Sequence, residues 1–192
     1  MDASASSLAA ASGRLRTQEA DDALLRRWQT RSTVWAASCD DAGVPLLLDA
    51  FDACLAHVDA AARLLVLDHG GEAVVAEAQR RGVGAHVEYV RDGAGARKAA
   101  LLAADALVAC GGTVGTVLDA LAVGTPVTGI DAGAAAHVAG VAALLWRMDD
   151  SAAGLIACTI ERLRADASLR SLLRARGHAR VSSLGASSRS SA

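Results

Sequence analysis

The chain has 192 residues, of which 53% are hydrophobic, 21% charged and only 3% aromatic. This length suits one ordinary domain with a full core, and the many alanines, leucines and valines favour helices packed on a compact sheet. The formal net charge of -2 and the shortage of aromatic side chains exclude both an electrostatic and a stacking platform for DNA or RNA. We therefore expect no nucleic-acid partner.

The sequence shows no sign of a membrane span or a secretory signal. No apolar run approaches the roughly 20 residues that a membrane-spanning helix needs. The start of the chain, MDASASSLAAASGRLR, lacks the basic beginning and the dense apolar segment of a signal peptide. These observations predict a cytoplasmic protein without a membrane span.

Both ends of the chain are rich in small polar residues. Residues 1–17 are rich in alanine and serine and are predicted to be disordered, and residues 182–192 are predicted to form a serine-rich tail. We expect one folded domain between them, at residues 18–181.

The folded part alternates between amphipathic helices and short apolar strands. In chain order, the pattern predicts a helix at 19–29, strand 33–37, helix 45–58, strand 64–67, helix 72–81, strand 86–90, helix 96–104, strand 106–109, helix 114–121, strand 126–130 and helices at 134–145, 151–164 and 169–180. Strands that are apolar throughout are typical of a parallel sheet covered on both faces. The sequence therefore predicts an α/β fold with a doubly wound parallel sheet.

A glycine-rich turn connects the strand at 106–109 to the helix that follows it. In a right-handed crossover this turn lies at the carboxyl edge of the sheet, next to the first turn of the helix. Unpaired N–H groups and the positive end of the helix dipole favour an anion at such a place. The residues of this candidate phosphate site are Gly111, Gly112, Thr113, Gly115 and Thr116.

Cysteine and histidine give little support to other chemistries. Cys39, Cys54, Cys110 and Cys158 form no CxxC pair, so neither a zinc knuckle nor a disulfide scaffold is indicated. Cys110 precedes the glycine turn but is expected to be a buried apolar residue. His69 is a candidate ligand-edge residue, whereas His86 and His137 are expected to be structural. No metal site is predicted.

The order of these elements resembles the C-terminal half of a GT-B glycosyltransferase, and within that group the O-linked N-acetylglucosamine transferase (SPINDLY-like) family. The resemblance covers about residues 32–184, and its segments are GVGAHVEYV, the pair Ala104 and Asp105, LDALAVGTPV and the closing RLRADASLRSLLRARGHARVSSL. It implies a Rossmann-like half of the GT-B fold, which binds the UDP part of a donor sugar and needs no cofactor besides that substrate.

The resemblance also implies roles for individual residues. Asp119 falls on the position of the acid that binds the ribose, and Thr116 and Thr113 fall near the turn hydroxyls that meet the diphosphate. The glycines of the turn would let the backbone approach the phosphates. Thr113 could instead simply cap the helix, and Asp119 could be a solvated or paired helix residue.

The sequence departs from the family in its charges. Where the family has a lysine after the first strand, this chain has Cys39, Asp40 and Asp41, and carboxylates there would repel a diphosphate. The histidine of the family's glycine turn is missing as well. Arg97, at a position that matches a family histidine, and Lys98 are candidates for the missing positive charge, unless they are only solvated cations.

A second consequence of the resemblance is a missing half. In the family the acceptor and the catalytic base belong to an N-terminal domain, so the catalytic residues of this chain are unknown. The chain could be a fragment, one subunit of a split transferase or a decayed relative. We expect a UDP-sugar-binding half that transfers N-acetylglucosamine or a related sugar to a hydroxyl acceptor with a partner domain, or that associates with itself. The alternative is a non-catalytic nucleotide-binding or protein-interaction module of the same fold.

Overall fold

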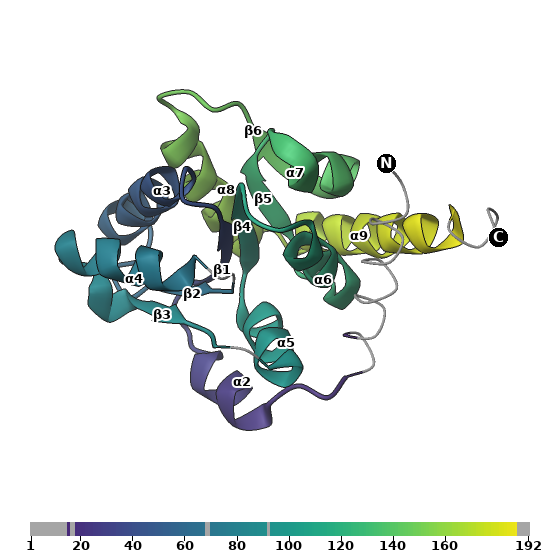
Figure 1. Ribbon diagram of the computed structural model, residues 1–192, viewed down its shortest axis with the longest axis horizontal. Coiled ribbons are helices and arrows are strands. Elements are labelled where there is room, and N and C mark those ends of the chain that lie inside the picture. The colour runs from purple at the N-terminus through teal and green to yellow at the C-terminus, as the bar shows by residue number, and fades with distance from the viewer. Residues whose placement is uncertain (1–14, 16–17, 68–69, 92, 188–192) are drawn as a thin grey trace.

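The computed structural model describes residue 15 and residues 18–67, 70–91 and 93–187 (Figure 1). Its centre is a six-stranded parallel sheet with the order β3-β2-β1-β4-β5-β6. The strands are β1 (Val34–Cys39), β2 (Arg63–Val66), β3 (Val87–Tyr89), β4 (Ala106–Cys110), β5 (Val127–Ile130) and β6 (Ala143–Trp146). The predicted doubly wound α/β fold is confirmed.

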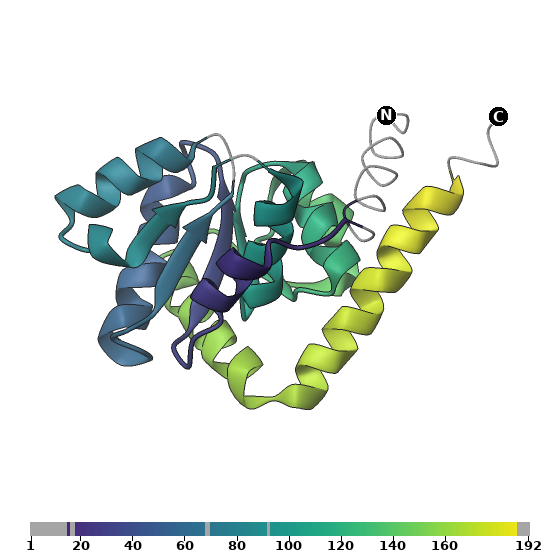
Figure 2. The same cartoon turned by 90° about the horizontal axis from the view of Figure 1, so that it is seen from below.

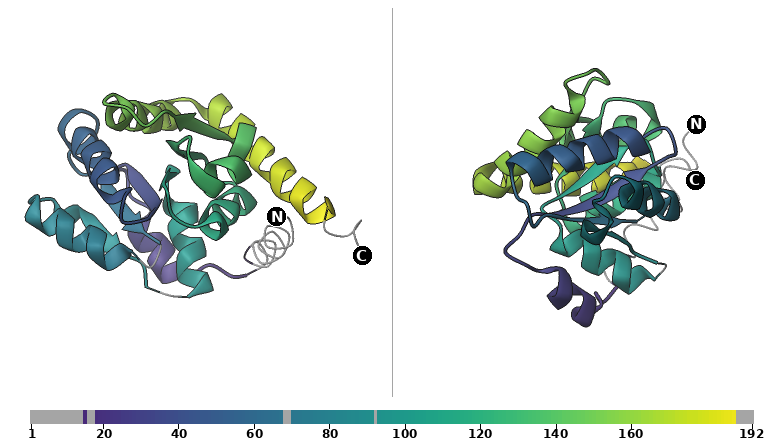
Figure 3. Two further views of the ribbon diagram at one scale, coloured as in Figure 1. Left: turned by 45° about the horizontal axis from the view of Figure 1, so that its top comes forward. Right: turned by 90° about the vertical axis from the view of Figure 1, so that its left-hand side faces the viewer.

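Helices cover both faces of the sheet (Figure 3). One face carries α3 (Val44–His57), α4 (Gly71–Arg80) and α8 (Ala152–Ala165), and the other carries α2 (Asp22–Trp28), α5 (Ala94–Ala103), α6 (Val114–Val123) and α7 (Gly133–Ala139). Successive residues of β1 point to opposite faces, so Trp35 packs with the first group and Val34 with the second. Burial on both sides explains why the strand has a continuous apolar sequence.

A polar cluster closes the amino edge of the sheet, and we call it the amino-edge cluster: Thr33, Asp59, Asp105 and Arg164. Asp59 accepts hydrogen bonds from the backbone N–H and the hydroxyl of Thr33 at 2.6 and 2.9 Å. Asp105 accepts the N–H of the first residue of β1 at 2.9 Å. Arg164 donates to the Thr33 hydroxyl at 2.6 Å and to the carbonyl of Arg31 at 2.7 Å. These bonds join α8 to the start of β1.

The last helix, α9 (Ala167–Ser187), crosses the ends of several earlier helices (Figure 2). Its arginines donate to carbonyl groups in the last turns of α8, α6 and α7, where unpaired carbonyls and the negative end of the dipole favour a cation. The pairs are Arg170 with Arg164 at 2.6 Å, Arg174 with Gly124 at 3.2 Å, and Arg180 with Val138 and His137 at 2.8 and 3.2 Å.

The largest error of the sequence prediction lies between residues 134 and 145, where one helix was expected. The structure has three elements there: α7 ends at Ala139, a short 3-10 helix, η2 (Gly140–Ala142), follows, and β6 begins at Ala143. Gly140 has φ +49°, which ends the helix. The strand ALLW was missed because so short an apolar run has no periodicity that separates it from a buried helix.

Two smaller boundaries also differ. His86 was expected to open the third strand, but it ends a 3-10 helix, η1 (Gly84–His86), and its Nδ1 lies 3.0 Å from the carbonyl oxygen of Ala62. Helix α9 continues to Ser187, past its expected end at Arg180 and into the predicted tail. The predicted disordered segment 1–17 falls outside the described residues except for Leu15, which is buried.

No helix among the described residues combines the length and the apolar character that crossing a membrane requires.

Candidate functional site

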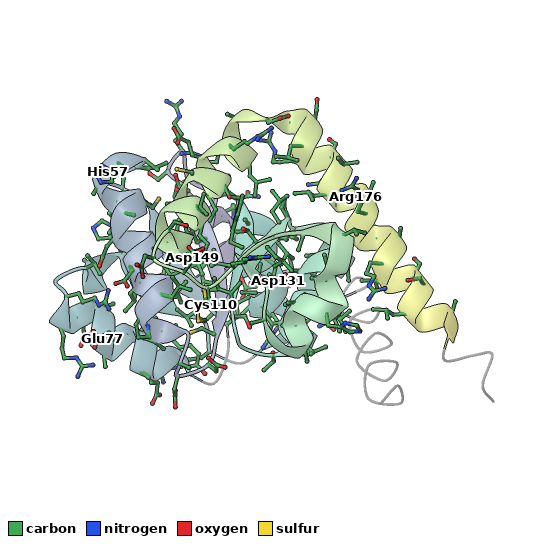
Figure 4. All side chains as sticks on the ribbon, turned by 90° about the horizontal axis from the view of Figure 1, so that it is seen from above. His57, Glu77, Cys110, Asp131, Asp149 and Arg176 are labelled. Atoms are coloured by element: carbon green, nitrogen blue, oxygen red, sulfur yellow. The ribbon has the colours of Figure 1, made fainter. Side chains whose placement is uncertain are left out.

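The candidate site lies where the sheet changes direction. From β1 the chain proceeds outward to β2 and β3, and from β4 it proceeds the opposite way to β5 and β6, so the loops after β1 and β4 diverge. Cys39 and Cys110 are register partners at the ends of these two strands. Seen from above (Figure 4), Cys110, Asp131 and Asp149 lie in the middle of the molecule, between Glu77 on α4 and Arg176 on α9. In open α/β sheets, ligands bind outside the carboxyl ends of the strands at such a switch point.

The glycines of the turn after β4 fit closely against the loop after β1. Gly111 and Gly112 have φ +85° and +77°, values that a side chain rarely tolerates. A Cβ atom on Gly112 would stand 2.1 Å from the hydroxyl oxygen of Ser38, and one on Gly111 would stand 2.6 Å from the carboxylate of Asp40. Gly112 is therefore required by the packing of the chain itself, because backbone atoms of Ser38 and Cys39 would lie 2.7 and 2.8 Å from its Cβ. At Gly111 the neighbour is the end of a flexible side chain, and the positive φ is the main constraint. Gly115 is the second residue of α6 and is half-buried.

Thr113 caps the helix that follows the turn. Its hydroxyl oxygen accepts the N–H of Thr116 at 3.3 Å and lies 2.8 Å from the Thr116 hydroxyl. Its own N–H donates to the Ser38 hydroxyl at 3.2 Å. Among the described residues, the N–H groups of Val114 and Gly115 have no acceptor, as is usual for the first residues of a helix. The start of α6 therefore keeps donors for an anion, although the cap already uses others.

Arg97, on α5, extends to this helix start. Its Nη1 donates to the Thr116 hydroxyl at 2.7 Å, and its Nη2 donates at 3.1 Å to the carbonyl of Leu67, just after β2. The same Nη1 lies 3.6 Å from a carboxylate oxygen of Asp119. The structure thus brings together residues that the sequence proposed separately, and we call Arg97, Thr113, Thr116 and Asp119 the switch-point cluster.

The members of this cluster differ in exposure. The Thr116 side chain is fully buried, whereas 28% of the Arg97 side chain and 16% of the Asp119 side chain remain exposed. Thr113 is exposed at the surface. A ligand that meets Thr113 and the start of α6 would therefore reach the guanidinium and the carboxylate at a partly solvated position.

Negative charge lies on the other side of the turn. Asp40 and Asp41 are exposed, and the Asp40 carboxylate accepts the N–H of Gly43 at 2.9 Å, which fixes it beside Gly111. Burial, with smaller contributions from the neighbouring Cys39 and Asp40, raises the pKa of the Cys110 thiol to about 12. Cys110 is 2% exposed and is thus the buried, unreactive thiol that the sequence predicted.

The remaining candidates lie elsewhere or cannot be placed. Lys98 donates to the carbonyl of Gln18, in the segment before α2. His69 lies outside the described residues. His137 is in α7, and its carbonyl accepts from Arg180. The described part of the chain contains no group of three or more histidine, cysteine, aspartate or glutamate side chains that could hold a metal ion.

Sequence reasoning missed two contributors to the site. The Ser38 hydroxyl positions the turn, and the Leu67 carbonyl anchors Arg97. The one signal for the role of Ser38 was the presence of a serine in an otherwise apolar strand, where its side chain is fully buried. A backbone carbonyl leaves no signal in a sequence.

Neither a scan against protein-family profiles nor a search of curated proteins finds a match to this sequence. Solved structures do resemble it. Sucrose-phosphate synthase from Thermosynechococcus elongatus superposes with a TM-score of 0.66 at 21% identity, over 88% of this chain and 46% of the other. HepE from Anabaena, solved with UDP and glucose, gives 0.64 at 17% identity, over 92% and 54%.

The C-terminal domain of a group 1 glycosyltransferase, LpcC from Francisella tularensis, has a TM-score of 0.60 at 15% identity, over 86% of this chain and 94% of that domain. This chain therefore corresponds in extent to one domain, and it spans about half the length of sucrose-phosphate synthase and HepE. The likeness shows the fold: a Rossmann-like α/β domain of the kind found in GT-B glycosyltransferases.

Proposed function

We propose that this chain is the donor-binding half of a glycosyltransferase and that its ligand is a UDP-sugar. The observation that carries the proposal is the switch-point cluster, which places a cation, hydroxyls and a carboxylate at the start of α6. It occurs on a fold shared with HepE, which was solved with UDP-glucose. The family resemblance of the sequence supports the same ligand.

Each part of the ligand has a suitable partner. The diphosphate would accept hydrogen bonds from the N–H groups of Val114 and Gly115 and from the Thr113 hydroxyl, with the helix dipole and the Arg97 guanidinium offsetting its charge. The ribose hydroxyls would donate to Asp119. No metal or further cofactor is required by this arrangement, because the protein supplies the cation.

For the sugar and the acceptor we propose N-acetylglucosamine or a related sugar and a hydroxyl group. The support is the likeness of LDALAVGTPV, residues 118–127, to the O-linked N-acetylglucosamine transferase family. A partner domain would supply the acceptor site and the catalytic base, either as a separate protein or through self-association. The compartment we propose is the cytoplasm.

A second candidate function is a non-catalytic nucleotide-binding or protein-interaction module. The observation that favours it is the position of Asp40 and Asp41, whose carboxylates stand where the resembled family has a lysine. Two unit charges about 4 Å apart interact by roughly 4 kcal/mol near a protein surface, so a carboxylate beside a diphosphate weakens binding considerably.

The test is calorimetric titration of the full chain with UDP, UDP-N-acetylglucosamine and UDP-glucose. We expect weak UDP binding that becomes roughly tenfold tighter in Asp41→Lys, because a repulsive charge becomes an attractive one. Asp41 is preferable to Asp40, which holds the Gly43 N–H. Asp150→Lys, the same charge change at an exposed position after β6, is the matched control and should change the affinity much less.

Tighter binding of UDP-N-acetylglucosamine than of UDP-glucose would support the proposed sugar. If neither the natural chain nor Asp41→Lys binds UDP, the donor-site function is wrong and the interaction module takes its place.

A further inference from the structure

The pairing of Arg97 with Asp119 has a consequence for which molecules can bind. We propose that these two side chains neutralise each other in the empty site and that only a ligand carrying both a diphosphate and vicinal hydroxyls separates them favourably. The inference rests on the proposed function and adds to it a selection rule: nucleoside diphosphates and their sugars are bound, whereas a nucleoside or pyrophosphate alone is disfavoured.

The contacts of Arg97 show how the separation would occur. Its bonds to the Thr116 hydroxyl and the Leu67 carbonyl are 2.7 and 3.1 Å long, whereas its approach to Asp119 is 3.6 Å. The two shorter bonds go to neutral acceptors, so the guanidinium stays anchored when its only charged partner among the described residues turns to a ligand. Thr116 is in the first turn of α6, so the anchored guanidinium lies next to the place where the helix start favours an anion.

The charges explain why half of the ligand is not enough. The ribose hydroxyls of uridine can donate to Asp119. This weakens the ion pair between Asp119 and Arg97, and uridine has no anionic group that would take the place of the carboxylate at Arg97. Pyrophosphate satisfies Arg97 but brings negative charge towards the Asp119 carboxylate. UDP satisfies both groups in one event, because its phosphates replace the carboxylate at Arg97 and its ribose replaces the guanidinium at Asp119.

The experiment titrates the full chain and its variants with UDP, uridine and inorganic pyrophosphate. Asp119→Asn is the informative variant. It should weaken UDP binding roughly tenfold through the loss of the charged acceptor for the ribose, and tighten pyrophosphate binding several-fold through the removal of the competing carboxylate. Arg97→Met should weaken both UDP and pyrophosphate by about tenfold or more and leave uridine as tight as before or tighter.

Two controls separate this coupling from general electrostatics. Asp131→Asn removes one exposed carboxylate at the same edge of the sheet, after β5, and should leave pyrophosphate binding nearly unchanged. In the Arg97→Met background, Asp119→Asn should tighten pyrophosphate binding less than it does in the natural chain, because the competition for Arg97 is gone and only the direct repulsion between the carboxylate and the phosphates remains. Circular dichroism checks that each variant is folded.

The outcomes distinguish the two proposals. If UDP binds but Asp119→Asn leaves pyrophosphate binding unchanged or weaker, the selection rule is wrong and the donor site stands. If Asp131→Asn tightens pyrophosphate binding as much as Asp119→Asn, the effect is long-range charge and the rule is again wrong. If no ligand binds to the natural chain or to any variant, both the site and the rule are wrong.

Discussion

The two edges of the sheet are both polar, but they are built differently. In the amino-edge cluster, Asp59 and Arg164 bond to Thr33 from positions 26 and 131 residues away along the chain. In the switch-point cluster, Arg97 and Asp119 meet at a single helix start, and both remain partly exposed. The short bonds of the amino edge hold β1 and α8 together, whereas the Arg97–Asp119 contact is 3.6 Å long and partly solvated, so that this pair can exchange its partners for a ligand. The predictions below test this difference.

The largest loss of stability should come from a substitution at Gly112. It would show that the loops after β1 and β4 pack tightly against each other. Gly112→Ala should lower the free energy of unfolding by about 3–5 kcal/mol, because it adds a backbone penalty for positive φ to a clash with β1. Gly133→Ala is the matched control: its φ is +75°, against +77° at Gly112, but nothing lies within 4 Å of the added carbon. It should cost only about 1–2 kcal/mol. Urea unfolding measures both.

Equal losses in these two variants would contradict the packing described for the turn. The result also bears on ligand binding, since a substitution at Gly112 that abolishes binding would report a damaged turn rather than a blocked phosphate.

The same carboxylate-to-amide change should distinguish the two edges. Asp59→Asn should cost about 1.5–3 kcal/mol, because Asp59 is the charged acceptor of several hydrogen bonds at the start of β1. Asp119→Asn should cost about 1 kcal/mol or less, because its ion pair is long and partly solvated. Chemical denaturation at neutral pH is the measurement, and a larger loss at Asp119 than at Asp59 would reverse the comparison.

The loss of stability at acid pH should also depend on the amino-edge cluster. Burial alone would raise the pKa of Asp59, but hydrogen bonds from Thr33 and Ala61, together with Arg164, outweigh it and lower that pKa. The stability that Asp59 contributes is therefore present above its unfolded-state pKa and lost as the pH falls through its lower folded-state pKa. Asp59→Asn should flatten the fall in stability between about pH 5 and pH 3, as measured by urea unfolding.

Asp105 should have the opposite effect to Asp59 on how the stability of the fold depends on pH. Burial raises its pKa more than the N–H bond from Val34 and the charge of Arg164 lower it. Its folded form therefore holds the proton more tightly, so its contribution is largest below the unfolded-state pKa and declines as the pH rises through the folded-state pKa. Asp105→Asn should make the loss of stability on acidification steeper, and a flatter profile would show that this assignment is wrong.

The smallest expected effect concerns the arginines of α9 that bond to carbonyl groups at the carboxyl ends of earlier helices. Arg180→Met should cost about 0.5–1 kcal/mol through the loss of its two bonds to the end of α7. Arg176→Met, whose only described carbonyl contact is 3.5 Å long, is the control and should cost less than about 0.5 kcal/mol. If the two variants melt at the same temperature, capping by α9 contributes nothing measurable.

Much of the fold could be predicted because its signals are local. The burial of β1 and β4 on both faces leaves continuous apolar runs, and the glycine turn marks the start of α6. Strand β6 could not be predicted in the same way, since its four residues follow an alanine-rich helix and are separated from it only by the short η2, which begins at Gly140. Apolar sequence sets burial, but it does not set secondary structure over so short a segment.

For the candidate site, the sequence indicated which residues to consider but not which contacts they make. The helix start, Thr116 and Asp119 followed from the turn and the resemblance, but the bonds of Arg97 depend on how α5 packs beside α6. The glycines were assigned to phosphate approach, whereas Gly112 also has a structural reason in Ser38, 74 positions earlier in the numbering. The amino-edge cluster was missed entirely, because its pairs lie so far apart in the chain that no sequence pattern links them.

The position of α9 also implies an order of events during protein synthesis. Gly124, at the end of α6, and Arg174, which binds its carbonyl, are 50 positions apart. At translation rates of about 5–20 residues per second, Arg174 is synthesised roughly 3–10 seconds after Gly124. During that interval the carbonyl of Gly124 lacks the guanidinium that α9 later supplies. We therefore expect α9 to dock after the helices whose carboxyl ends it caps have formed.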